Sequence, residues 1–269
     1  MNINGTEYTI GADPEIFVKD GGGFVSAHDL VQGTKENPYP VDKGAVQVDG
    51  MALEFNIDPA SSPEEFEDNI NTVMAQLGSM IGDLEFLKES SVTFDKEFLV
   101  GVPRENLALG CEPDYNAYTQ QPNPPPSEGE LMRTTGGHVH VGGFTTGDIR
   151  CAIHNYSAGM LAKALDETLG IYSLFWDNDD KRREMYGQAG AYRPKTYGME
   201  YRTLSNKWIF RPELIRFVYD AVAEALTNLH DPNYEGVEDA QDIINTSNRN
   251  HPIFENNPKV AFLKNLVGA

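Results

Sequence analysis

The chain has 269 residues, 40% of them hydrophobic, with no stretch of about eighteen apolar residues, so we expect a globular protein without a membrane-spanning helix. Its 41 acidic residues outnumber 21 lysines and arginines, and the formal net charge of −20 argues against nucleic acid or an anionic membrane as a partner. The start lacks a basic segment followed by an apolar run, and the two cysteines, Cys111 and Cys151, are too few for a disulfide framework, so we expect a cytoplasmic protein in which both are structural.

The first third of the chain predicts strands followed by a long helix. Strand-like runs, separated by glycine-rich and polar turns, cover residues 6–18, 45–49 and 51–57. Ser62 then begins a capping box with Pro63 at the first helical position, and apolar residues recur at helical spacing as far as Leu84. A further strand is predicted over residues 91–98.

The rest of the chain predicts a flap, two polar strands and several helices. Residues 99–129 are rich in proline and asparagine, which indicates a surface flap. Next come a predicted strand with His138 and His140 and a helix from near Thr146. The charged segment DNDDKRREMYG and a strand over 198–205 follow, and a helical tail begins at about 211, where Pro212 opens its first helix. No repeat or composition break divides residues 1–269, so we predict one α+β domain with an antiparallel or mixed sheet.

Four polar pairs on predicted strands indicate a site. Side chains alternate along a strand, so His138 and His140 in GGHVHVG share one face, as do Asp13 and Glu15 in GADPE. Neighbouring carboxylates on a partly buried strand raise each other's pKa unless a cation lies between them, which favours hard-metal ligands.

The same pattern recurs at Glu54 and Asn56 in LEFNI and at Glu200 and Arg202 in MEYRT. Any one pair alone is also typical of the solvated side of an amphipathic strand. The four pairs together favour one polar site on a single sheet face.

The motifs GADPEIF, DGMALEFNIDPA, RTTGGHVHVGG and YRPKTYGMEYRTLSN resemble the glutamine synthetase and glutamate-cysteine ligase superfamily, most closely its phage-associated carboxylate-amine ligase branch. The resemblance spans about residues 9–210 and implies a curved antiparallel sheet funnel with helices on its outer face. Carried over by position, it implies metal ligands at Asp13, Glu15, Glu54, His138 and Glu200. By the same match, His140 approaches the nucleotide phosphates, and Arg193 and Arg202 meet the transferred phosphoryl group. Asp13 stands where the family usually has glutamate, one methylene longer.

The resemblance implies a reaction that needs no protein nucleophile. A small-molecule or peptide carboxylate attacks the γ-phosphorus of ATP to give an acyl phosphate, and an amine then displaces phosphate to form an amide bond. Mg²⁺, or Mn²⁺ in its place, neutralises the triphosphate. The location would be the host cytoplasm if the chain is phage-encoded.

Several residues outside the matched motifs carry weaker expectations. Asp49 and Glu112 are candidates for the base that deprotonates the amine. Arg133 either binds a carboxylate or braces its strand. Arg182 and Arg183 could reach substrate or nucleotide, but their charged surroundings favour a solvated helical face.

Two other functions fit the same residues in part. A guanidino-type phosphotransferase shares the superfamily's sheet, but it depends on arginines and a reactive cysteine more than on a metal cluster of carboxylates and histidine. A non-catalytic metal-binding or peptide-binding module would have no use for phosphate-binding arginines. We therefore favour an ATP-dependent ligase that forms C–N bonds.

Overall fold

The fold is built on one large antiparallel sheet, seen here in a computed structural model that describes residues 1–107, 114–124, 131–144 and 147–268. Its strands, in spatial order, are β11 (Tyr115–Asn116), β14 (Ala191–Lys195), β15 (Gly198–Tyr201), β13 (Gly137–Gly142), β3 (Thr9–Ile16), β8 (Ala52–Ile57), β7 (Gly44–Asp49) and β6 (Tyr39–Val41). All neighbours in this order pair antiparallel. The predicted α+β class with an antiparallel sheet is confirmed.

Three small sheets surround the large one. They pair β1 (Asn2–Ile3) with β2 (Thr6–Glu7), β10 (Ser91–Thr93) with β12 (Met132–Thr134), and β4 (Val18–Asp20) with both β5 (Gly23–Val25) and β9 (Glu85–Phe86). The strand β12 lies directly before β13 in the chain, so its pairing with β10 positions the backbone that enters the strand with the two histidines.

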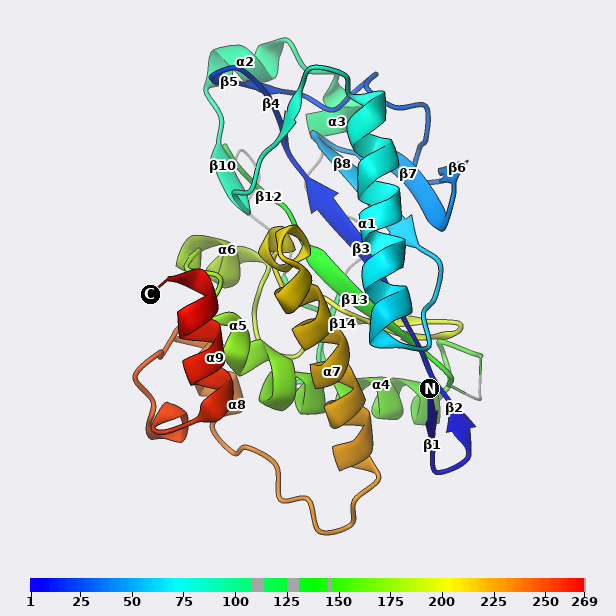
Figure 1. Ribbon diagram of the computed structural model, residues 1–269, viewed down its shortest axis with the longest axis vertical. Coiled ribbons are helices and arrows are strands. Elements are labelled where there is room, and N and C mark those ends of the chain that lie inside the picture. The colour runs from blue at the N-terminus through cyan, green and yellow to red at the C-terminus, as the bar shows by residue number, and fades with distance from the viewer. Residues whose placement is uncertain (108–113, 125–130, 145–146, 269) are drawn as a thin grey trace.

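Of the helices, α1, α4 and α7 pack on one face of the large sheet (Figure 1). The longer ones are α1 (Pro63–Met80), α4 (Ala152–Leu165), α7 (Pro212–Leu229) and α9 (Pro258–Val267). The shorter ones are α2 (Lys96–Val100), α3 (Arg104–Leu107), the π-helix η1 (Asp166–Gly170), α5 (Ile171–Ser173), α6 (Asp180–Met185), α8 (Ala240–Asn245) and the 3₁₀ helices η2 (Asn206–Phe210) and η3 (Pro252–Phe254). Among the helices described, none has the length and apolarity needed to cross a membrane.

Strand alternation separates an apolar face from a polar one. Ile10, Ala12 and Ile16 of β3 and Val139 and Val141 of β13 are buried in one hydrophobic cluster with residues of α1, α4 and α7. Because successive side chains point to opposite faces, the polar residues between them lie on the face away from these helices. The apolar face therefore anchors the sheet and leaves the other face for a site.

The N-terminus of α1 has the predicted Ser62 cap and Glu65 partner, although Glu65 accepts from the residue before the N-cap rather than from the N-cap itself. The Ser62 hydroxyl accepts a hydrogen bond from the Glu65 N–H at 3.2 Å, and the Glu65 carboxylate accepts one from the Ser61 N–H at 2.8 Å. The predicted stripe is confirmed from Phe66 to Leu77, which are fully buried, but the helix ends at Met80, so the prediction that it extends as far as Leu84 was too long.

The predictions for residues 91–98 and for the flap over 99–129 were wrong in part. The strand β10 ends at Thr93 and α2 begins at Lys96, and Phe94 between them packs against Phe17 and Phe98, with ring centroids 6.0 Å and 5.2 Å away. The predicted flap contains the helix α3 and the edge strand β11, although its residues 108–113 and 125–130 lie outside the described chain.

Two later boundaries also differ. The predicted helix start near Thr146 lies outside the described residues, and the described helix α4 begins at Ala152. The strand predicted over 198–205 ends at Tyr201. Beyond it the carbonyls of Thr203 and Leu204 accept hydrogen bonds from a buried guanidinium, and pairing with β13 is reduced to the Gly137 N–H bond to Leu204 and an isolated bridge between Gly136 and Ser205. The helix opened by Pro212 and the helical tail are confirmed.

Candidate functional site

Cross-strand pairing places the predicted site residues on one sheet face. Across β14, β15 and β13, the register aligns Arg193, Glu200 and His140. On the next strands His138 lies opposite Asp13, Glu15 opposite Glu54, and Glu54 opposite Gln47. Directly opposed residues share a face, so these side chains all project away from the helices.

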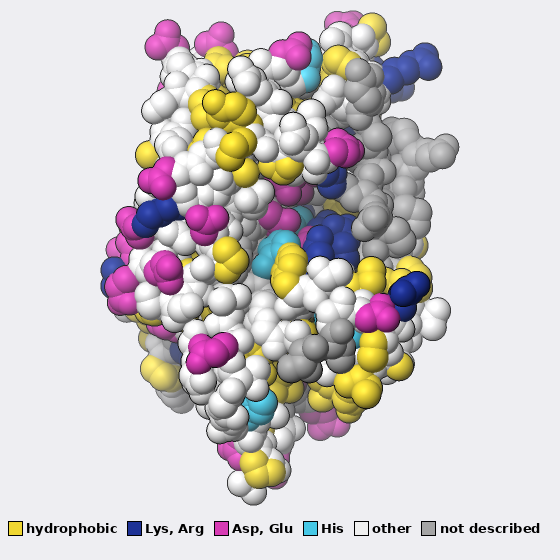
Figure 2. All heavy atoms as spheres, turned by 90° about the vertical axis from the view of Figure 1, so that its right-hand side faces the viewer, with side chains coloured by type: hydrophobic (Ala, Val, Ile, Leu, Met, Phe, Trp, Pro, Cys, Tyr) yellow, Lys and Arg dark blue, Asp and Glu magenta, His cyan; other side chains and the backbone are white. Residues whose placement is uncertain are grey.

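The polar face forms the floor of a cavity of about 520 Å³. Its charged and titratable lining residues are Asp13, Glu15, Lys35, Asp49, Glu54, His138, His140, Arg193, Lys195, Tyr197 and Arg202. Figure 2 shows a hollow in which a histidine lies beside acidic and basic side chains. Carboxylates gather toward β3, β8 and β7, and cations gather toward β14 and β15, so the cavity is electrically two-sided.

Asp13 and the two histidines meet at the centre of this cavity. His140 Nε2 lies 3.0 Å from Asp13 Oδ1, and His138 Nδ1 lies 3.3 Å from the same oxygen. Burial alone would raise the pKa of Asp13, but attraction to His140 lowers it below its ordinary value. Asp13 Oδ1 and His140 Nε2 are buried, and within the described part of the chain neither forms a hydrogen bond of good geometry.

Glu200 is fully buried beneath a set of cations. Arg202 Nη1 contacts its Oε1, while Lys195 Nζ and Arg193 Nη1 lie 2.9 Å and 3.4 Å from its Oε2. Burial alone would raise the pKa of Glu200, but Arg202 first and then the histidines and Arg193 hold it well below its ordinary range. Three cations around one carboxylate leave excess positive charge at this end of the cavity.

Glu15 and Glu54 form the opposite, acidic end. Burial raises the pKa of Glu54 well above its ordinary value, repulsion from Asp13, Glu15 and Asp49 raises it further, and a 2.6 Å hydrogen bond from the Gln47 amide lowers it only in part. Burial likewise raises the pKa of Glu15, which accepts a hydrogen bond from a backbone N–H at 2.8 Å. These carboxylates would be stabilised as anions by an added cation.

The donor set fits a hard divalent metal ion. Asp13, His140 and Glu200 each offer one ligand atom within 4.8 Å of the others. Carboxylate oxygens with one imidazole suit Mg²⁺ or Mn²⁺, and the buried Asp13 and His140 atoms without hydrogen bonds are where a metal ion would bind. The metal-ligand roles expected for Asp13, Glu15, Glu54, His138 and Glu200 stay predictions, and Glu200 already contacts three cations.

The residues with weaker expectations lie in several places. Asp49 lines the cavity and pairs with Lys35 at 3.4 Å, whereas Glu112 and Cys111 lie outside the described residues. Arg133 donates hydrogen bonds to the carbonyls of Met132 and Leu107, both at 3.1 Å. These contacts are those expected if Arg133 braces its strand. The prediction that Arg182 and Arg183 lie on a solvated helical face was wrong, since both side chains are buried.

Lys195 and Tyr197 line the cavity but were not predicted. Lys195 lies two residues after Arg193 on β14, so the alternation that identified the other pairs would have placed it on the same face. Tyr197 comes from the β14–β15 turn, where no periodicity applies. Its hydroxyl contacts His140 Nδ1, and the two rings lie 5.9 Å apart between centroids. The contact fixes the orientation of the His140 ring, with Nε2 toward Asp13.

Comparison with known families gives one match. Residues 132–241 match the family described as phage phiEco32-like COOH.NH2 ligase-type 2, which confirms the resemblance over less than half of the chain. This segment contains His138, His140, Arg193, Glu200 and Arg202, whereas the acidic end of the cavity comes from residues before it. No curated protein matches the chain.

Proposed function

Since residues 132–241 match a family of carboxylate-amine ligases, we propose that the protein is an ATP- and Mg²⁺-dependent ligase that forms amide bonds through an acyl phosphate. The observation that carries this proposal is the two-sided cavity. An acidic end suited to metal ions faces a cationic end suited to phosphate, and Asp13, His138 and His140 lie between them. A nucleotide triphosphate with its metal ions has the matching charges.

The proposed reaction has two steps. First, a carboxylate oxygen of the substrate attacks the γ-phosphorus, the bond to the β-phosphate oxygen breaks, and ADP leaves. An amine then attacks the acyl carbon, the C–O bond to phosphate breaks, and inorganic phosphate and an amide form as the amine loses a proton. When bound, Mg²⁺ or Mn²⁺ would neutralise phosphate charge.

We assign each cavity residue a role in this reaction from its place in the cavity. Arg193 and Arg202 would stabilise the charge that develops on the transferred phosphoryl group, and Lys195 would help to hold the phosphates beside them. Asp13, Glu15, Glu54, Glu200 and one or both histidines would hold the metal ions. Asp49 lines the acidic end and is the remaining described candidate for accepting the amine proton.

The fold supports a funnel like that of the glutamine synthetase superfamily. The large sheet is antiparallel, its helices pack on one face, and the cavity opens on the other. We include this assignment in the proposal, together with a location in the cytoplasm.

The guanidino-type phosphotransferase is less well supported. Of the two cysteines, Cys151 lies at the N-terminus of α4 and is not among the residues that line the described cavity, while Cys111 lies outside the described residues. The carboxylate cluster at the cavity's acidic end also has no clear use in a reaction that depends on arginines and a thiol.

The testing experiment supplies ATP, Mg²⁺ and a panel of amino acids and short peptides as carboxylates, with hydroxylamine as the amine. We expect ADP, phosphate and a hydroxamate in equal amounts from at least one carboxylate, and no product from the Asp13→Asn variant. A phosphorylated acceptor without hydroxamate would show a phosphotransferase. Binding of metal without any ATP binding or turnover would show a non-catalytic module.

A further inference from the structure

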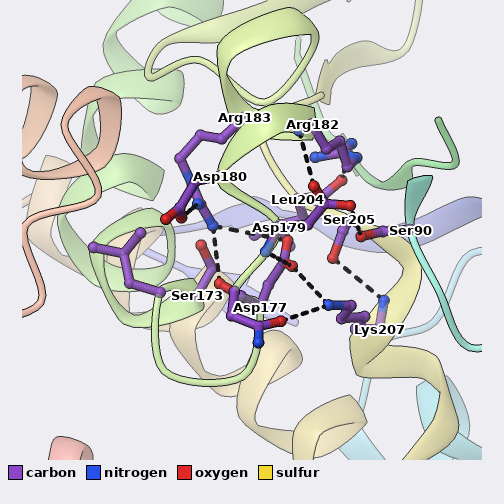
Figure 3. Close-up of polar contacts among 12 residues, drawn as sticks. Ser90, Ser173, Asp177, Asp179, Asp180, Arg182, Arg183, Leu204, Ser205 and Lys207 are labelled. Carbon is purple, nitrogen blue, oxygen red and sulfur yellow. Dashed lines mark hydrogen bonds and ion pairs between the residues drawn. The ribbon is translucent and has the colours of Figure 1, made fainter. Parts of the chain in front are cut away.

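Two adjacent arginines on the short helix α6 are buried although they stand in a strongly charged segment. Arg182 is 2% exposed and Arg183 is 4% exposed. Figure 3 shows Arg182 next to Leu204 and Arg183 beside Asp180. The two side chains therefore contact different parts of the molecule.

Arg182 binds three backbone carbonyls at once. Its Nε donates to the Thr135 carbonyl at 2.9 Å, its Nη1 to the Thr203 carbonyl at 3.1 Å, and its Nη2 to the Leu204 carbonyl at 2.7 Å. The planar guanidinium has fixed donor directions, so one side chain sets the spacing between two chain segments.

Both segments belong to the candidate site. Thr135 precedes Gly136, whose N–H donates to the Glu15 carboxylate at 2.8 Å, and β13 with its two histidines begins at the next residue. Thr203 directly follows Arg202. The Leu204 carbonyl also accepts a hydrogen bond from the Gly137 N–H at 3.0 Å, so it joins the start of β13 to the chain that leaves β15.

The surroundings of Arg182 are shaped for this contact. A Cβ atom at Gly187 would lie 2.8 Å from Arg182 Nη1 and 3.0 Å from the Thr203 carbonyl oxygen, so glycine leaves room for the guanidinium. Burial lowers the pKa of Arg182 to about 10, and attraction to Asp177 and Glu15 limits the decrease. The side chain therefore remains a cation at neutral pH.

We propose that Arg182 is a positioning residue for the reaction, because it fixes the start of β13 relative to the end of β15 and so sets the places of His138 and Arg202. It lies outside the cavity lining and acts only through these strands. This inference rests on the proposed function for its catalytic readout.

Arg183 provides the matched control. It binds the Asp180 carboxylate at 2.9 Å, the Ser247 hydroxyl at 3.1 Å and the Asp177 carbonyl at 3.2 Å. The Ser247 contact joins α6 to the C-terminal tail, the other two lie within or just before α6, and none involves a carbonyl next to a site residue. It is equally buried, so its loss should lower stability without moving the site.

The experiment compares Arg182→Lys, Arg182→Met and Gly187→Ala with Arg183→Lys and Arg183→Met. For each variant, kcat, KM for ATP and amide hydrogen exchange are measured on protein shown to be folded by near-ultraviolet circular dichroism. We expect Arg182→Met to lower kcat about 10²-fold while KM for ATP changes less than about threefold, since misplacing reacting groups by about 1 Å costs that much. Arg182→Lys and Gly187→Ala should lie between Arg182→Met and the unmodified protein.

Hydrogen exchange separates this inference from the proposed function. The Arg182 variants should exchange faster in peptides covering 132–140 and 200–206, and the Arg183 variants faster in peptides covering 240–250, with kcat within about twofold of the unmodified protein. If the unmodified protein has no ligase activity, the proposed function fails. The hydrogen-exchange pattern still tests whether Arg182 holds the start of β13 against the end of β15. Unchanged kcat in the Arg182 variants, equal kcat losses in the Arg183 variants, or failure of Arg182→Lys to fold while Arg183→Lys folds would overturn the inference.

Discussion

The cavity and the segment around α6 (residues 177–187) both gather acids and bases, but the cavity is electrically two-sided, whereas Asp177 and Asp180 of the α6 segment lie beside bases that neutralise them. There Asp177 lies 3.2 Å from Lys207 Nζ, and Asp180 lies 2.9 Å from Arg183 and 2.8 Å from Arg249. In the cavity Glu15 faces Glu54 across the strands, and Glu200 alone receives three cations. Unbalanced buried charge is costly, which indicates that the cavity's partners are ligands rather than its own side chains.

The carboxyl pKa values show the same difference. A hydrogen bond from Arg249 holds the pKa of Asp180 below its ordinary value, whereas burial and like charges raise that of Glu54 well above it. A half-exposed carboxylate bonded to arginines therefore stabilises the fold in one region, whereas a buried carboxylate among like charges in the other would be stabilised as an anion by an added cation.

The largest effect should come from the cationic end of the cavity. Arg202→Ala should lower turnover about 10²- to 10³-fold and leave ATP affinity nearly intact, because the guanidinium would act on charge that appears only during transfer. Steady-state kinetics with equilibrium binding of ATP measures both quantities. The control is Arg216→Ala, which removes an exposed guanidinium paired with Glu67. Normal turnover in Arg202→Ala would contradict the assigned role.

Asp166 is a carboxylic acid outside the cavity whose pKa is also raised. It therefore shows whether a raised pKa alone is enough to indicate a ligand-binding site. It is buried behind the sheet, where the hydroxyls of Tyr201 and Tyr118 donate to it at 2.6 Å and 2.9 Å, and burial raises its pKa from 3.8 to about 7. The folded state thus holds this proton more tightly than the unfolded chain, so the resulting stability is present below about pH 4 and is lost as the pH rises through 7.

The matched variant is Asp166→Asn, which cannot titrate. We compare the free energies of unfolding of the two proteins. The value for the unmodified protein minus that for the variant should fall by roughly 1.4 kcal/mol for each pH unit between 4 and 7. Urea unfolding of both proteins at several pH values measures this slope. Metal affinity should be the same in both, and a parallel pH dependence in the two proteins would show that Asp166 does not titrate in this range.

The smallest effect should come from a residue remote from both regions. Ser62→Ala removes the cap of α1 and should lower the free energy of unfolding by about 1 kcal/mol, measured by urea unfolding. Turnover and metal affinity should not change, because the cap lies on the helical side of the sheet. A loss of metal binding in this variant would mean that stability, rather than the cavity charges, controls the binding measurements.

Much of the cavity could be predicted because strand alternation depends only on local sequence. The shared face of Asp13, Glu15, His138 and His140 follows from spacings of two residues and holds whatever the strand order is. The apolar stripe and cap of α1 were predictable for the same reason, since both are patterns within a few turns of one helix.

The contacts that support the site were not predictable. Arg182 lies in a local sequence typical of a solvated helix. Its partners are Thr135, 47 residues earlier in the chain, and Thr203, 21 residues later. The strand β14 was also missed, because it is only five residues long and contains Pro194, a residue type uncommon inside a strand. Such features depend on which segments meet in space, and no local pattern records that.

The central claim is that the cavity, unlike the α6 segment, binds divalent metal ions with ATP. The most direct measurement is titration of the metal-free protein with Mn²⁺, following the free ion by electron paramagnetic resonance with and without a non-hydrolysable ATP analogue. We expect Mn²⁺ binding that the analogue strengthens, that Glu54→Gln weakens at least about tenfold, and that Asp180→Asn leaves unchanged. Mn²⁺ that stays free at millimolar protein concentration, or binding that Glu54→Gln and Asp180→Asn affect equally, would contradict the account.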